Sequence, residues 1–127
     1  MTASDTSRRL VTVAATAADD KQAIDLVALD VSQVLPFADA FLIVSGRNER
    51  QVQAIADEVE ERMLEAGQKR LRREGREQGR WVLLDFGDLV VHIFHEEERV
   101  YYSLERLWRD CPVIPLGLAP IEGPSSM

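Results

Sequence analysis

The chain of 127 residues has the length of one ordinary domain with a single hydrophobic core. Hydrophobic residues at 46% and charged residues at 29% exclude a chain that is disordered over most of its length. The net charge of −7 argues against a protein that wraps nucleic acid over its whole surface.

The first predicted elements are a helix and two strands. Apolar residues recur at helical spacing from Leu10 to Ala17, which predicts a helix over 6–19. The run 24–33 is apolar in both of its alternating sets of residues, so we expect a strand that is covered on both faces of a sheet. A second short apolar strand is predicted over 40–44.

The clearest helix begins after Asn48, a favourable N-cap that is followed three residues later by Gln51. Apolar residues continue at helical spacing to Leu64, and Gly67 follows where a left-handed residue often ends a helix. The opposite face is predicted to be solvated and carries four acidic residues, Asp57, Glu58, Glu60 and Glu61.

The next stretch, 69–80, is basic and admits at most a short strand and a turn. It holds six basic and two acidic residues, a local charge of +4 that leaves −11 for the rest of the chain. Such a stretch either steers a charged partner or is a solvated strand edge, and both interpretations stay open.

The runs Trp81–Phe86 and Leu89–Phe94 have only Gly87 and Asp88 between them, which is the pattern of a β-hairpin. Three glutamates, 96–98, then lead into a short helical pattern that ends at residue 108.

Residues 111–127 contain four of the five prolines and are expected to be irregular. Together the elements predict one α/β domain over 1–115, in which helices flank a mixed sheet, followed by an irregular tail over 116–127.

Two patterns resemble metal sites. Asp85-Phe86-Gly87 matches the metal-binding triplet of protein kinases, but the chain lacks their nucleotide loop and strand lysine, so these residues more plausibly shape the hairpin turn. His92 and His95 are three apart on a strand and therefore point to opposite faces, unless the strand stops at Phe94.

Three further patterns could carry catalysis or anion binding. Ser45-Gly46 follows a strand, as in nucleotidyltransferases, but the paired aspartates that would bridge two metals are missing. Free amides before the Asn48 helix could bind an anion, although ordinary capping explains that segment better. Cys111, the single cysteine, lies beside Pro112 and is interpreted as a buried or idle thiol. We therefore predict no catalytic residue, metal or cofactor.

The sequence also bears on location. No window approaches the roughly 20 apolar residues that cross a bilayer. The N-terminal segment lacks the apolar run of a secretory signal, so we expect a cytoplasmic protein without a membrane partner.

Aromatic residues crowd into one region, since six of the eight lie between Trp81 and Trp108. On the last predicted helix, an apolar stripe starts at Val100, and a second stripe of Tyr101, Glu105 and Trp108 runs beside it. One stripe can hold the helix to a sheet, whereas a second stripe of tyrosine and tryptophan is typical of a protein interface. The alternative is that both stripes belong to the core.

The run RWVLLDFGDLVVHIFHEEERVYYSLERLW, from Arg80 to Trp108, closely resembles the signature of the ribosomal silencing factors, also called the Iojap family. The similarity extends upstream through DAFLIVSGRNERQVQAIADEVEERM, Asp39 to Met63, and covers roughly residues 6–115. The resemblance implies a nucleotidyltransferase-like α/β domain without catalytic carboxylates. It also implies a protein that is not an enzyme and is a homodimer when free.

The resemblance further implies a partner and an activity. Members bind ribosomal protein L-fourteen on the large ribosomal subunit and block joining of the small subunit, which represses translation in starvation or stationary phase; a role in large-subunit biogenesis is also implied. The basic stretch 69–80 is a candidate for contacts with ribosomal RNA phosphates. By position, the expected docking residues are Trp81, Leu83, Asp85, Asp88, His92, Tyr101, Tyr102, Glu105 and Trp108.

Two other functions remain open at this point. One is a degenerate or metal-dependent nucleotidyltransferase, and the other is a homodimeric scaffold whose aromatic stripe is its own dimer interface.

Overall fold

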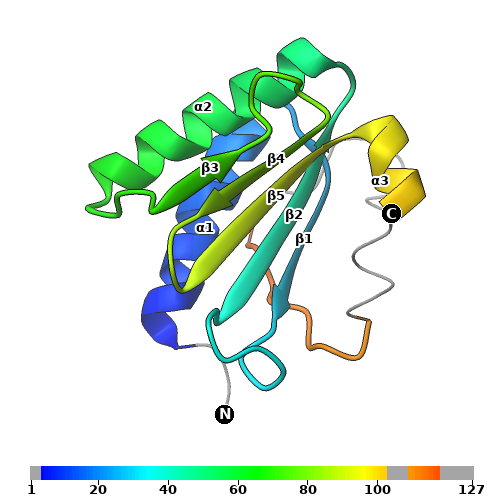
Figure 1. The fold of residues 1–127 in the computed structure, drawn as a ribbon. Helices are drawn as coiled ribbons and strands as arrows, with labels where there is room; N and C mark the ends of the chain where they lie inside the picture. The colour runs from blue at the N-terminus through cyan, green and yellow to red at the C-terminus, as the bar shows by residue number, and fades with distance from the viewer. Residues whose placement is uncertain (1–3, 103–108, 118–127) are drawn as a thin grey trace.

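The computed structural model describes residues 4–102 and 109–117, with only the backbone described for 100–102. Its five strands form one sheet in the order β1-β2-β5-β4-β3. The elements in chain order are α1 (Asp5–Asp20), β1 (Ile24–Asp30), β2 (Ala40–Gly46), α2 (Glu49–Glu65), β3 (Arg72–Glu74), β4 (Trp81–Asp85), β5 (Leu89–His95) and α3 (Glu96–Tyr102) (Figure 1).

The sheet is mixed, as predicted. β2 and β5 are parallel neighbours, whereas the pairs β1–β2, β4–β5 and β3–β4 are antiparallel. The chain that joins the two parallel strands passes through α2, because parallel strands need a crossover connection.

Helices α1 and α2 cover one face of the sheet, and Figure 1 is viewed from the other face. Fully buried side chains such as Leu42 of β2 and Ile93 of β5 meet Ile55 and Val59 of α2 in this layer. The helix stripe and the alternating strand residues thus bury one another in a single core, as their spacings predict.

The start of α2 is fixed by its own side chains. Asn48 Oδ1 accepts a hydrogen bond from the Gln51 amide at 2.8 Å, and Gln51 Oε1 accepts one from the Arg47 amide at 2.6 Å. At Gly46 a Cβ would lie 3.0 Å from Val52 Cγ2, so the missing side chain lets β2 run close to α2. The predicted capping is confirmed, and Gly67 has the left-handed φ of 88° expected at the helix end.

The prediction that the acidic face of α2 is solvated is confirmed for Asp57 and Glu61, which are exposed, and is wrong for Glu58 and Glu60, which are half-buried. The basic stretch 69–80 runs back along α2, and its arginines pair with that face. Arg76 lies 2.6 Å from Asp57, Arg73 lies 3.1 Å from Glu60, and Arg70 also pairs with Glu60. The positive charge of these side chains is therefore largely neutralised within the molecule.

The prediction that β1 is covered on both faces is also wrong for its first half. β1 is an edge strand, and Ile24, Leu26 and Val27 are only partly buried. The second half of β1 gains a short partner from the C-terminal segment, because the Asp30 amide donates to Pro112 O at 2.8 Å and the Ile114 amide donates to Ala28 O at 2.9 Å.

The C-terminal segment that was expected to be irregular has no helix or regular strand over 109–117. It is nevertheless held to the domain, since Ile114 is buried in the core and Leu116 packs against it. The division of the chain at residue 115 stays a prediction.

The last helix begins at Glu96, directly after β5 and four residues before Val100, where the predicted apolar stripe starts. The rest of this predicted helix, residues 103–108, lies outside the described residues. Within the described parts of the chain, no helix has the length and apolar character needed to span a membrane.

Candidate docking surface

The sheet face turned away from α1 and α2 carries most of the predicted docking residues that the structure describes. We call it the front face; it is formed by Phe41, Ile43, Trp81, Leu83, Asp85, Val90, His92 and Phe94. The register pairs Trp81 with Phe94, Leu83 with His92 and Asp85 with Val90 across the β4–β5 hairpin. Since alternate side chains of a strand share a face, four predicted residues come together there: Trp81, Leu83, Asp85 and His92.

Aromatic rings pack along the front face. The Trp81 and Phe94 ring centroids are 4.8 Å apart, and Phe41 meets His92 edge-on at the same distance. Phe94 is fully buried, whereas Trp81 and Leu83 are half-buried. Trp81 is therefore partly buried on this face, and its contacts with Phe94 and His92 fix the orientation of its ring.

His92 orients Trp81 and is itself buried. Its Nδ1 accepts a hydrogen bond from Trp81 Nε1 at 3.2 Å, and only 6% of the residue is exposed. Burial lowers the pKa of His92 to about 4, so the ring is neutral at pH 7 and carries its proton on Nε2. The buried Nε2 has no hydrogen-bond partner among the described residues.

The turn of the β4–β5 hairpin is shaped by Asp85, as the sequence predicts. Asp85 Oδ1 accepts a hydrogen bond from the Gly87 amide at 2.8 Å, and Gly87 has a φ of 92° that favours glycine. Arg72 lies 3.7 Å from the other carboxylate oxygen of Asp85. Asp88, by contrast, is exposed, and its backbone carbonyl accepts hydrogen bonds from the amides of Asp39 and Ala40.

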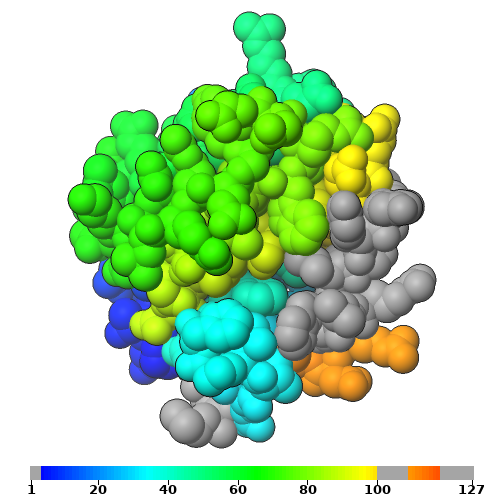
Figure 2. Space-filling model, viewed as in Figure 1, coloured from blue at the N-terminus to red at the C-terminus, as the bar shows by residue number. Residues whose placement is uncertain are grey.

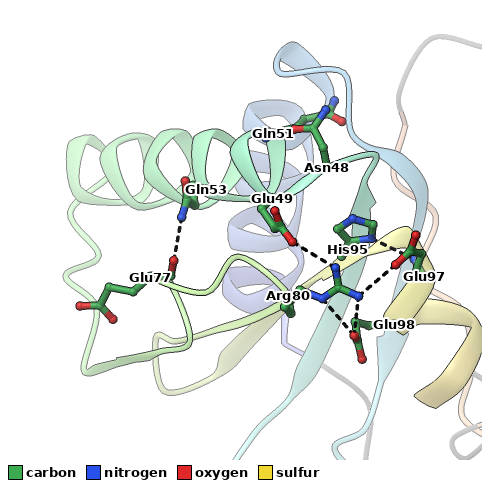
Figure 3. A network of polar contacts seen from close by, with 9 residues as sticks. All are labelled: Asn48, Glu49, Gln51, Gln53, Glu77, Arg80, His95, Glu97 and Glu98. Atoms are coloured by element: carbon green, nitrogen blue, oxygen red, sulfur yellow. Dashed lines mark hydrogen bonds and ion pairs between the residues drawn. The ribbon is translucent and has the colours of Figure 1, made fainter.

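An arginine that the sequence analysis did not single out holds α3 against the rest of the domain. Arg80 donates to Glu98 at 2.8 and 3.0 Å, to Glu97 at 3.1 Å and to Glu49 at the start of α2 at 3.1 Å (Figure 3). These carboxylates raise the pKa of Arg80 above its usual value. The run of three glutamates, 96–98, is the feature of the sequence that could have pointed to Arg80. It directly follows His95, the last residue of β5, whose amide donates to the Arg80 carbonyl at 2.8 Å, so the glutamates start beside this arginine.

A histidine and a second arginine complete the attachment of α3. His95 Nδ1 accepts from the Glu97 amide at 3.1 Å and so caps the helix. Arg99 is 8% exposed and donates to Ser45 Oγ and to the Asp25 carbonyl, each at 2.7 Å. The first turn of α3 is thereby fixed to β1, β2 and α2 together.

The remaining predicted docking residues lie on or beyond α3. Tyr101 and Tyr102 are in the last turn described, where the structure gives the backbone alone. Glu105 and Trp108 lie outside the described residues.

The described residues offer surface for recognition more than groups for chemistry. Within 4–102 and 109–117 no three His, Cys, Asp or Glu side chains gather as a metal site. His92 and His95 belong to opposite faces of β5, as predicted. Cys111 packs against the front-face cluster, and burial together with Asp110 and Asp30 raises the pKa of its thiol, which disfavours the reactive thiolate.

Comparisons of sequence and of structure with known proteins give matches over most of the chain. The family model described as "Ribosomal silencing factor during starvation" matches residues 4–126. A protein of Halalkalibacterium halodurans named ribosomal silencing factor RsfS is 49% identical over 87% of this chain and 94% of its own length. A protein of Bacillus subtilis with the same name is 47% identical over 86% of this chain and 92% of its own length. A crystal structure of a Bacillus halodurans protein superposes with a TM-score of 0.76 at 48% identity and covers 85% of this chain and 98% of that one.

Proposed function

Because the chain belongs to the ribosomal silencing factor family, we propose that it represses translation by occupying the large ribosomal subunit and blocking the small subunit from joining. Membership itself implies a ribosome-associated protein that silences translation. The proposal adds the binding partner, ribosomal protein L-fourteen, and the steric mechanism. It places this repression in starvation or stationary phase, and it includes a further role in large-subunit biogenesis. The protein acts by binding and not as an enzyme.

The observation that carries the proposal is the partly exposed row Trp81, Leu83 and Asp85 on β4, with the hairpin turn at its end. The other front-face residues are buried and support this row. Trp81 and Leu83 offer apolar area from a rigid strand, and the exposed carboxylate of Asp88 stands at the end of the same hairpin. Aromatic anchors beside charged rim groups are what protein interfaces use for affinity and for orientation. A basic protein surface with apolar depressions complements this arrangement.

The proposed partner is a ribosomal protein more than ribosomal RNA. Four of the five arginines of 69–80 are already paired with acidic residues of α2 and α3. The fifth, Arg72, lies near Glu74 and Asp85. An exposed carboxylate next to the aromatic surface also repels phosphate. Contact of the basic stretch with ribosomal RNA is therefore the weaker part of the proposal.

The setting of the proposal is the cytoplasm, with a homodimer as the free form. If the aromatic surface of one copy covers that of another, dimerisation and ribosome binding compete. Light scattering of the free protein, followed by sedimentation with increasing amounts of large subunits, separates the two states.

The test is co-sedimentation of the purified protein with free large subunits at moderate salt, together with a subunit-joining assay. The informative variant is Asp88→Lys, because the side chain is exposed and its replacement leaves the core intact. We expect at least about tenfold weaker binding, since a like charge facing a basic partner is unfavourable. Glu61→Lys makes the same charge change on an exposed position of α2 and is the matched control.

Two outcomes contradict the proposal. The first is that the unaltered protein does not bind large subunits or leaves subunit joining unchanged. The second is that Asp88→Lys and Glu61→Lys weaken binding equally, which indicates a general charge effect and no specific docking surface.

A further inference from the structure

Exposed apolar side chains gather at one end of the sheet. Five large hydrophobic residues are strongly exposed among those the structure describes, and three of them lie at this end: Val34 at 54%, Phe37 at 68% and Leu71 at 71%. We call these three residues the apolar corner. β2 and β5 begin here and β4 ends here, so segments far apart in the sequence meet around the turn of the β4–β5 hairpin.

The apolar corner flanks that turn on both sides. On one side the Leu71 amide donates to the Asp85 carbonyl at 2.7 Å, and on the other the Asp39 amide donates to the Asp88 carbonyl at 2.8 Å. A Cβ on Gly87 would lie 3.6 Å from Leu71 Cδ1, which places the leucine side chain against the turn. The turn that carries Asp85 and Asp88 therefore lies between Leu71 on one side and the segment that leads into β2 on the other.

The loop that carries Val34 and Phe37 is held in place. The amides of Val34 and Leu35 both donate to the Val31 carbonyl, and Leu35 and Ala38 pack against the front-face cluster. Figure 2 shows this loop, in cyan, protruding on the same side of the molecule as the β4–β5 hairpin. An exposed aromatic ring on an anchored loop loses little conformational freedom when a partner covers it, which is the property of an interface anchor.

We propose that the apolar corner is a second anchor of the docking surface, at which Phe37 and Leu71 enter apolar depressions of a basic protein while Asp88 pairs with one of its lysines or arginines. This inference rests on the proposed function, and it extends the contact from the front face around the end of the sheet. The occupant is a protein, because RNA phosphates would face the carboxylates of the turn.

The test compares Phe37→Ala and Leu71→Ala with Leu64→Ala in the same large-subunit co-sedimentation assay. Leu64 is 59% exposed on α2 and supplies a comparably exposed apolar side chain in the helix layer. We expect about tenfold weaker binding for Phe37→Ala, a further loss in the Phe37→Ala, Leu71→Ala double variant, and unchanged binding for Leu64→Ala. Thermal midpoints should stay close to that of the unaltered protein, because none of the three side chains is buried.

The possible outcomes separate this inference from the proposed function. If Asp88→Lys weakens binding but Phe37→Ala and Leu71→Ala do not, the apolar corner is not an anchor and the proposed function stands. If the unaltered protein does not bind large subunits, both are wrong. If Phe37→Ala changes the self-association seen by light scattering and leaves ribosome binding intact, the corner contacts a second copy of this chain and the inference is overturned.

Discussion

The side chain of His92 sits beneath Trp81 on the front face, where burial lowers its pKa to about 4 from an ordinary value of 6.5. Above pH 6.5 the residue is neutral in the folded and the unfolded chain. Between pH 6.5 and 4 the unfolded chain binds the proton more readily. The stability that depends on a neutral His92 is therefore present above pH 6.5 and is lost as the pH falls toward 4.

We expect this residue to account for about 3 kcal/mol of the unfolding free energy lost between pH 6.5 and pH 4. The comparison is with His92→Gln, which does not titrate and still offers an oxygen to Trp81 Nε1. Urea unfolding followed by circular dichroism at several pH values measures both proteins. Equal pH dependence in the two would show that His92 does not couple folding to protonation.

At the scale of elements, α2 and the loop before β4 approach each other closely at a glycine. Gly79 has a φ of 66°, and a Cβ there would lie 2.9 Å from both the Cβ and the carbonyl oxygen of Glu49. Gly67 has a similar backbone, with a φ of 88°, but nothing lies within 4 Å of its Cβ position. The two glycines thus separate the cost of an unusual backbone from the cost of a clash.

Replacement of these glycines by alanine should therefore have unequal effects. Gly67→Ala is expected to lower the unfolding free energy by about 1 kcal/mol, from backbone strain alone. Gly79→Ala is expected to cost roughly 2–4 kcal/mol, because α2 must also shift. Chemical denaturation measures both, and a Gly79→Ala protein no less stable than Gly67→Ala would contradict the close approach.

The position of α3 relative to the front face depends on Arg80, which joins the starts of α2 and α3. Its ion pairs are partly exposed, so their loss changes overall stability little. The same loss leaves α3 without its link to α2, and the docking residues predicted on that helix lose a fixed position.

We accordingly expect Arg80→Gln to weaken large-subunit binding several-fold while its thermal midpoint changes little. Arg62→Gln is the control, since Arg62 also pairs with two carboxylates at a similar exposure but joins α1 to α2. Co-sedimentation and thermal unfolding of the two variants decide the question. An equal loss of binding in both would mean that Arg80 has no special part in placing α3.

At the scale of the whole molecule, the basic stretch 69–80 and the acidic face of α2 cancel much of each other's charge. We expect the double variant Arg73→Gln, Arg76→Gln to bind large subunits within about twofold of the unaltered protein, with the same dependence on salt. Binding measured from low to high salt provides the test. A salt slope that falls by about one for each arginine removed would indicate phosphate contacts and restore ribosomal RNA as a partner.

Local patterns in the chain are enough to predict its elements, whereas the docking residues are predicted from a family resemblance. Helical spacing and the caps at Asn48 and Gly67 depend on residues a few positions apart, and so does the hairpin turn at Asp85 and Gly87. The hairpin register follows from the same short connection, which is why Trp81 and His92 fall on one face. The docking residues on the hairpin and on α3 alike come from resemblance, and their role in docking remains a prediction.

Contacts between distant segments could not be obtained from those patterns. The order of strands places β1 at an edge, brings arginines of 69–80 onto α2 and sets Asp39 beside Asp88. Each of these depends on which surfaces bury one another when the layers assemble, and periodicity within a segment does not specify its neighbours in space. The amino-acid sequence therefore predicts the strands and the hairpin, and the tertiary structure determines which of their residues share the front face and how far the docking surface extends beyond it.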